Sequence, residues 1–163
     1  MNTVYIYLIL IIFSLIGCGD TNTSSNSLED ESVAECATGQ GQLCVLVTVP
    51  EDVPSLPEKV SVHFFSSLPP MGPPSILGAE IAEASELAQF TPGATVPLLI
   101  EGLPADGEMY LYGVLYMPGG GAQTWQTVPN VDFHGAYSWD DPVQFTGEPT
   151  NLENSISFNI YSE

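Results

Sequence analysis

The chain has 163 residues, of which 20 are acidic and only one, Lys59, is a lysine or arginine, giving a formal net charge of −19. Nucleic-acid binding depends on Lys and Arg displacing the counterions of phosphates, so this composition excludes it. Adsorption of the folded chain to anionic lipid is excluded for the same reason. The acidity itself has two interpretations: it keeps a secreted surface soluble by self-repulsion, or it attracts a cation or a cationic partner.

The N-terminal segment predicts export. An apolar run from Ile6 to Ile16 is interrupted only by Ser14 and ends just before Cys18. Such a run, followed by a small residue, is the pattern of a secretory signal peptide. The alternative is an uncleaved membrane anchor, but a spanning helix needs about 20 apolar residues and this run is shorter. We therefore expect residues 1–17 to be a signal peptide.

The end of this segment, Leu15-Ile16-Gly17-Cys18, resembles the lipobox of bacterial lipoproteins. The resemblance implies that Cys18 becomes the first residue of the mature chain and carries an acyl anchor such as palmitate. Gly19 stands where an Asp is linked to inner-membrane retention in enterobacteria. The resemblance therefore implies anchoring in the outer membrane of a bacterial envelope, on its periplasmic face or at the cell surface, through the lipid alone.

The segment 18–35 follows the lipobox and is rich in Ser, Asn, Thr, Asp and Glu. It has almost nothing to bury, so we expect it to be a disordered tether. The remaining segment, 36–163, has the length of one domain and can bury a sizeable core.

The chain has three cysteines, and their number predicts a disulfide. If Cys18 carries lipid, Cys36 and Cys44 remain as an even pair in an exported chain. The alternative is that both cysteines bind zinc, but partners are not close in the sequence because the only histidines are His63 and His134.

Apolar residues alternate with other residues along most of the domain, which is the period of strands. The alternating sets are Leu43, Val45, Val47 and Val49; Val60, Val62 and Phe64; Val96, Leu98 and Ile100; Tyr110, Tyr112, Val114 and Tyr116; Val143 and Phe145; and Ile156, Phe158 and Ile160, with a weaker run around Trp125. The tyrosine run is also apolar on its other face. It is therefore predicted to be a central strand covered on both sides, or a strand that shields a cleft.

Prolines and glycines separate these runs, in the segments 50–57, 68–74 and 118–121. About seven short strands with such turns predict an all-β fold, an antiparallel β-sandwich of the immunoglobulin-like or transthyretin-like kind. The segment 78–87 is ambiguous, because its spacing fits a short helix as well as an extended strand or loop.

The stretch from Ile100 through Gly102-Leu103-Pro104 and Gly107 to Tyr110 resembles a corner of transthyretin-like and carboxypeptidase-regulatory-like domains. The resemblance covers about a dozen residues, with longer spacing than is usual in that group. It implies a small β-sandwich that serves as a structural or binding module, and it carries over no functional residue.

The segment from Asn130 to Asp141 is a candidate calcium loop. Oxygen-bearing side chains recur at Asn130, Asp132 and Ser138, a glycine (Gly135) is sixth, and the carboxylate of Asp141 is twelfth. A histidine at the fifth position, Asp in place of the final Glu, and the lack of flanking helical patterns leave an Asx-rich surface loop as the alternative.

The same region is aromatic, through Trp125, Phe133, Tyr137 and Trp139. Aromatic rings flanked by acids and amides stack on sugars in many proteins, so these four residues are candidates for binding a glycan or another partner. The alternative is that they close one end of the sandwich core.

The sequence gives little support for a catalytic motif. A serine triad needs a histidine with an acidic partner and a nucleophile, and neither His63 nor His134 lies in a recognisable motif. We expect His63 to be a solvated or edge residue. Pairs of carboxylates could hydrolyse glycosides, but 20 acids in the chain make any pair uninformative. The sequence favours a lipid-anchored, non-enzymatic structural or interaction module, with a calcium- or glycan-binding module as the alternative and a surface hydrolase as the weakest hypothesis.

Overall fold

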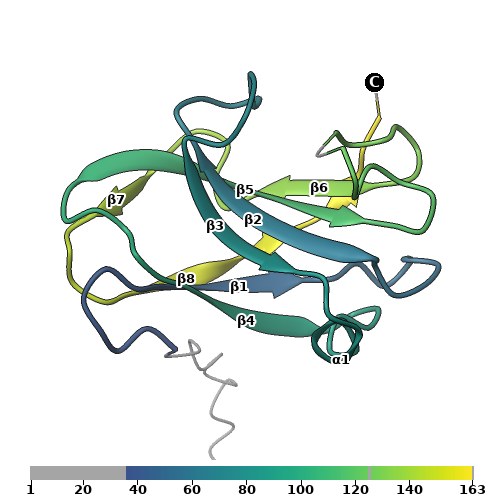
Figure 1. The fold of residues 1–163 in the computed structure, drawn as a ribbon, viewed down its shortest axis with the longest axis horizontal. Helices are drawn as coiled ribbons and strands as arrows, with labels where there is room; N and C mark the ends of the chain where they lie inside the picture. Colours follow the sequence, from purple (N-terminus) through teal and green to yellow (C-terminus); the bar gives the residue numbers. More distant parts are fainter. Residues whose placement is uncertain (1–35, 125, 163) are drawn as a thin grey trace, which may run out of the picture. The chain divides into compact units, whose positions relative to one another are not determined.

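The computed structural model describes residues 36–124 and 126–162, which form two packed β-sheets (Figure 1). The signal peptide, the lipidated Cys18 and the tether were predicted for residues outside this range. The elements are β1 (Leu43–Thr48), β2 (Lys59–Phe65), β3 (Ile76–Ile81), α1 (Ala84–Leu87), β4 (Thr95–Ile100), β5 (Gly107–Tyr116), β6 (Phe133–Ala136), β7 (Val143–Phe145), β8 (Thr150–Ser157) and β9 (Asn159–Ile160). The prediction of an all-β sandwich is confirmed.

The smaller sheet has the strand order β4-β1-β8, and the larger has the order β3-β2-β5-β6-β9, with β7 paired to the start of β5. In Figure 1 the smaller sheet lies below the larger one. Every pairing between described strands is antiparallel except that of β1 with β8, which is parallel. A parallel pair requires a long connection between its strands. Here every strand of the larger sheet except β9 lies between β1 and β8 in the sequence, and β9 follows β8.

The core lies between the sheets and is built by the alternation that predicted the strands. In β1, Leu43, Val45 and Val47 are at most 1% exposed, and in β2, Val60, Val62 and Phe64 are fully buried. In β4, Val96, Leu98 and Ile100 are buried while their neighbours are exposed. Successive residues of a strand point to opposite faces, so each set enters the space between the sheets.

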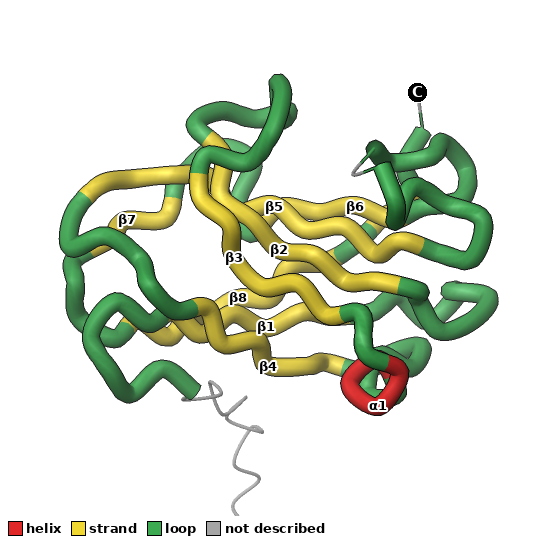
Figure 2. Tube along the Cα trace, viewed as in Figure 1, coloured by secondary structure: helices red, strands yellow, loops and turns green. Residues whose placement is uncertain are grey.

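Some segments differ from expectation, among them the run over Ile156, Phe158 and Ile160, which is divided between β8 and β9. The ambiguous segment 78–87 divides into both of its alternatives: β3 continues to Ile81, and α1 is a single helical turn that buries Leu87 (Figure 2). The weak strand expected around Trp125 is not found in the described residues on either side, which form turns and loops. The next strand is β6 instead, inside the candidate calcium loop.

The predicted disulfide between Cys36 and Cys44 is confirmed, with Cα atoms 5.4 Å apart. It joins the start of the described chain to β1. A second connection reinforces the first, because the side-chain amide of Asn151 in β8 accepts a hydrogen bond from the backbone N–H of Ala37 and donates one to its carbonyl. The amide thereby pairs with Ala37 as a neighbouring strand would.

Candidate functional site

A groove lies on the outer face of the larger sheet, away from the smaller sheet. Residues that alternate with the core set of β2, namely Ser61, His63 and Phe65, line it together with Tyr112, Val114 and Tyr116 of β5. The two apolar faces of β5 now have an explanation. One face packs in the core, and the other forms the floor of the groove, so the strand is central and also shields a cleft.

Two loops and the C-terminal segment form the walls. The loop between β2 and β3, which rises above the sheet in Figure 1, contributes the prolines 69, 70, 73 and 74. The segment between β5 and β6 contributes Thr124, Gln126 and Thr127. His134, Trp139 and Tyr161 also line the groove, together with Gly72 and Leu77. The cavity has a volume of about 960 Å³. Ligand sites for small molecules fall between roughly 300 and 1,000 Å³, so the groove is at the large end of that range.

An aromatic cluster at this site holds Trp139 in place. The hydroxyl of Tyr112 is hydrogen-bonded to Nδ1 of His134 at 2.7 Å. The Trp139 ring lies 6.2 Å from that of Tyr112 and 6.0 Å from that of His134, and Tyr161 lies 5.1 Å from His134, all near perpendicular. Edge-to-face contacts of this kind are favourable. They fix the orientation of the indole while 51% of the Trp139 residue surface stays exposed.

Two histidines and two tyrosines of the groove are kept uncharged near neutral pH by burial. Burial lowers the pKa of His63 and of His134 below the ordinary value of 6.5, which keeps both imidazoles neutral. Burial likewise raises the pKa of Tyr112 and of Tyr116 above 10, so both phenols stay protonated. The groove therefore offers rings, hydroxyls, amides and imidazoles without a formal charge.

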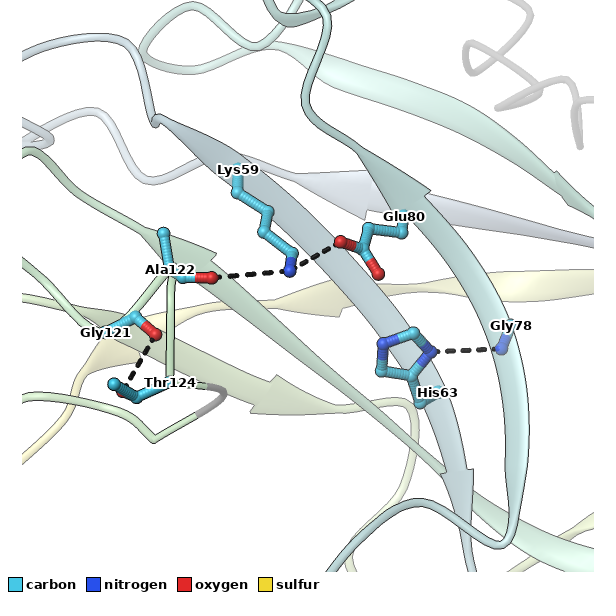
Figure 3. Close-up of polar contacts among 7 residues, drawn as sticks. All are labelled: Lys59, His63, Gly78, Glu80, Gly121, Ala122 and Thr124. Atoms are coloured by element: carbon cyan, nitrogen blue, oxygen red, sulfur yellow. Dashed lines mark hydrogen bonds and ion pairs between the residues drawn. The ribbon is translucent and has the colours of Figure 1, made fainter.

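His63 also supplies a hydrogen-bond acceptor at an irregular position of the sheet. The register of β2 with β3 shifts between Val62 and Phe64, so the ladder is irregular at His63. There the backbone N–H of Gly78 donates to Nδ1 of His63 at 3.0 Å (Figure 3). Because Nδ1 accepts this bond, the proton of the neutral ring is on Nε2. His63 is 4% exposed, so the expectation of a solvated or edge residue was wrong.

Lys59, the only Lys or Arg of the chain, lies beside the groove, and its ammonium has partners within the fold. Its ammonium is paired with the carboxylate of Glu80 on β3 and donates to the carbonyl of Ala122 at 3.4 Å (Figure 3). It also lies 5.7 Å from the centre of the Tyr116 ring, within reach of a cation–π interaction. Its positive charge is compensated within the fold.

Asp132, a predicted calcium ligand, is fully buried and binds backbone instead. Its Oδ1 accepts from the N–H of Met117 at 2.9 Å, and its Oδ2 accepts from those of Gly121 and Val128 at 2.9 and 2.7 Å. A side chain at Gly120 would place its Cβ 1.8 Å from Oδ1, so the glycine run lets the backbone close around the carboxylate. Asp132 thereby organises the wall segment between β5 and β6.

The other predicted calcium ligands lie in different environments. Asn130 is exposed with a positive φ of 59°, Asp141 is exposed, and the hydroxyl of Ser138 accepts from the backbone N–H groups of residues 140 and 141. Within residues 36–124 and 126–162, no group of three or more His, Cys, Asp or Glu is placed to hold a metal ion. Calcium binding by this loop stays a prediction.

Of the four aromatic residues proposed from the sequence, the structure places Trp139 in the groove. Phe133 is 5% exposed in the core and Tyr137 packs against that core, which is the alternative that the sequence left open. Trp125 lies outside the described residues. Sequence reasoning missed Tyr112 and Tyr161. The doubly apolar tyrosine strand was a signal for the first, whereas nothing local marked the second.

No protein-family model matches the chain, and no curated protein or solved structure matches it either. Among the described residues, no helix is long and apolar enough to cross a membrane. The function therefore has to be argued from the sequence and from the groove.

Proposed function

We propose that this protein is a lipid-anchored, non-enzymatic binding module of a bacterial envelope. The lipobox supports the anchor, and Cys18 would carry the lipid. The groove supports the binding role. It is large enough for a ligand, its lining residues include no Asp, Glu, Lys or Arg, and Trp139 is exposed but fixed by Tyr112 and His134. That fixed, exposed indole is the observation on which the binding role rests.

The anchor is tested by processing in a bacterial host. Globomycin, which blocks lipoprotein signal cleavage, and the variant Cys18→Ser should each leave a larger precursor, and the variant should incorporate no labelled palmitate. Cys36→Ser with Cys44→Ser is the control, because it removes the other cysteines and should leave processing intact. Unchanged migration and labelling of Cys18→Ser would refute the anchor.

The binding role is tested by NMR on the mature lipidated protein in detergent micelles. Envelope polysaccharide, lipid and protein fractions are added separately, and the side-chain signals of His134 and Trp139 are followed. At least one fraction should shift these signals while leaving Leu99, which is exposed on the opposite sheet, unchanged. If every fraction leaves the groove signals in place, the binding role is wrong.

A further inference from the structure

The lining of the groove differs in charge from the rest of the chain. The chain has 20 Asp and Glu, yet no described lining residue is Asp, Glu, Lys or Arg. An anionic ligand would meet a net charge of −19 with no cation in the groove to bind it. A cationic ligand would be drawn to the carboxylates elsewhere on the surface. The groove itself therefore suits an uncharged ligand.

The remaining lining combines two chemistries side by side. Trp139, which is half exposed, supplies aromatic surface, while Gln126 and Thr127 on the rim supply amide and hydroxyl groups that both donate and accept hydrogen bonds. A pyranose ring has the matching construction, with apolar C–H faces and a rim of hydroxyls. A purely apolar ligand would leave the polar groups in the groove without partners, which costs binding energy.

A proline-rich peptide also binds aromatic grooves, but it fits this one less well. One wall consists of the prolines 69, 70, 73 and 74 of the chain itself, and proline has no backbone N–H to donate. A proline-rich ligand brings carbonyl acceptors and few N–H donors. Ligand and wall would therefore both lack the N–H donors that the carbonyls of the other could accept from. A sugar brings its own hydroxyl donors and does not depend on that wall for them.

We propose that the groove binds a neutral oligosaccharide, with one pyranose ring stacked on the exposed part of Trp139 and sugar hydroxyls bonded to Gln126 and Thr127. This inference rests on the proposed binding role and names its ligand class. The aromatic cluster pre-orients the indole, so little conformational freedom is lost when the sugar binds. Sugars without charged groups are expected to bind, and uronic or sulfated sugars are expected to be rejected.

The test uses the mature lipidated protein in nanodiscs and isothermal titration calorimetry. The probes are neutral gluco-, xylo-, manno- and N-acetylglucosamine oligosaccharides, with oligogalacturonate, sulfated heparin fragments and a polyproline decamer for comparison. At least one neutral oligosaccharide should bind and the comparison ligands should not. Trp139→Ala should weaken that binding by about tenfold or more, the loss expected for one stacking contact.

Two further variants separate binding from folding. Gln126→Ala changes an exposed rim residue and should weaken the sugar severalfold without lowering the melting temperature. Tyr110→Phe is the matched control, because Tyr110 is on β5 but outside the lining, and its affinity should equal that of the wild type.

Binding of the charged sugars or the polyproline peptide in place of the neutral set would overturn the proposal, as would full affinity in Trp139→Ala. Failure of the whole neutral set would overturn it as well. If the lipid or protein fraction still shifts the groove signals in the NMR experiment, the binding module survives and only its ligand class is wrong.

Discussion

At the scale of single residues, Asp132 stabilises the wall segment of the groove between β5 and β6. Its carboxylate satisfies three backbone N–H groups that no strand ladder pairs. Asp132→Asn keeps one acceptor oxygen and turns an N–H donor toward donors. We expect it to lower the free energy of unfolding by about 2–3 kcal/mol, measured by urea denaturation. Asp140→Asn changes an exposed carboxylate and should stay within about 0.5 kcal/mol of the wild type. Equal free energies of unfolding for the two variants would show that Asp132 does not stabilise this segment.

The ion pair between Lys59 and Glu80 is asymmetric, since their side chains are 8% and 39% exposed. Removing the carboxylate takes an ion-pair partner away from a mostly buried ammonium, whereas removing the ammonium leaves a carboxylate that water still reaches. We therefore expect Glu80→Gln to cost about 3 kcal/mol and Lys59→Met to cost less than about 1 kcal/mol. Chemical denaturation of both variants measures the difference, and the reverse order would contradict the argument.

At the scale of elements, β6 can pack against the corner between β8 and β9 only because it contains a glycine. A Cβ at Gly135 would lie 2.3 Å from the carbonyl oxygen of Ser157, and Gly113, its partner across the ladder, faces the ring of Phe158. Gly135→Ala must push the strands apart. We expect a loss of about 3 kcal/mol in a thermal or urea melt. Gly39→Ala is the control, because the three atoms nearest to its added Cβ are all in the flexible side chain of Gln42, and it should lose less than about 1 kcal/mol.

The elements also show how far the sequence predicts this fold. β1, β2, β4 and β5 were predicted because each alternates over several large apolar residues, which is the signal that period-two burial leaves. β6 was missed because its four residues, Phe133–Ala136, include a histidine and a glycine and owe their strand form to pairing with β5 and β9.

The groove follows the same division. The two apolar faces of β5 predicted its floor. Its walls were not predicted, because Trp139 and Tyr161 are brought to the floor by long-range packing, and Asp132 reaches its three backbone donors through a loop conformation. Asp132 was a candidate calcium ligand because the local sequence pattern of a carboxylate that binds backbone is the same as that of one that binds a cation, and calcium binding by the loop stays a prediction.

At the scale of the whole molecule, stability should depend on pH through the two histidines. Burial lowers the pKa of both His63 and His134 in the folded state, so these two side chains bind fewer protons in the folded protein than in the unfolded chain once the pH falls below about 6.5. Stability contributed by the neutral rings is fully present above that pH and is lost as the pH falls toward the folded-state values. Protonation of His63 would also end the hydrogen bond that its Nδ1 accepts from Gly78.

The free energy of unfolding in urea should therefore decrease from pH 7.5 to pH 5.0, although acid relieves the repulsion among 20 carboxylates. The variant with His63→Gln and His134→Gln keeps that repulsion and lacks the imidazoles, so it is the matched control and should show a flatter or inverted dependence. Equal slopes in the wild type and the variant would show that the histidines do not govern the acid sensitivity. A steeper wild-type slope would mean that the uncharged state of the groove and the stability of the sheet beneath it depend on the same two rings.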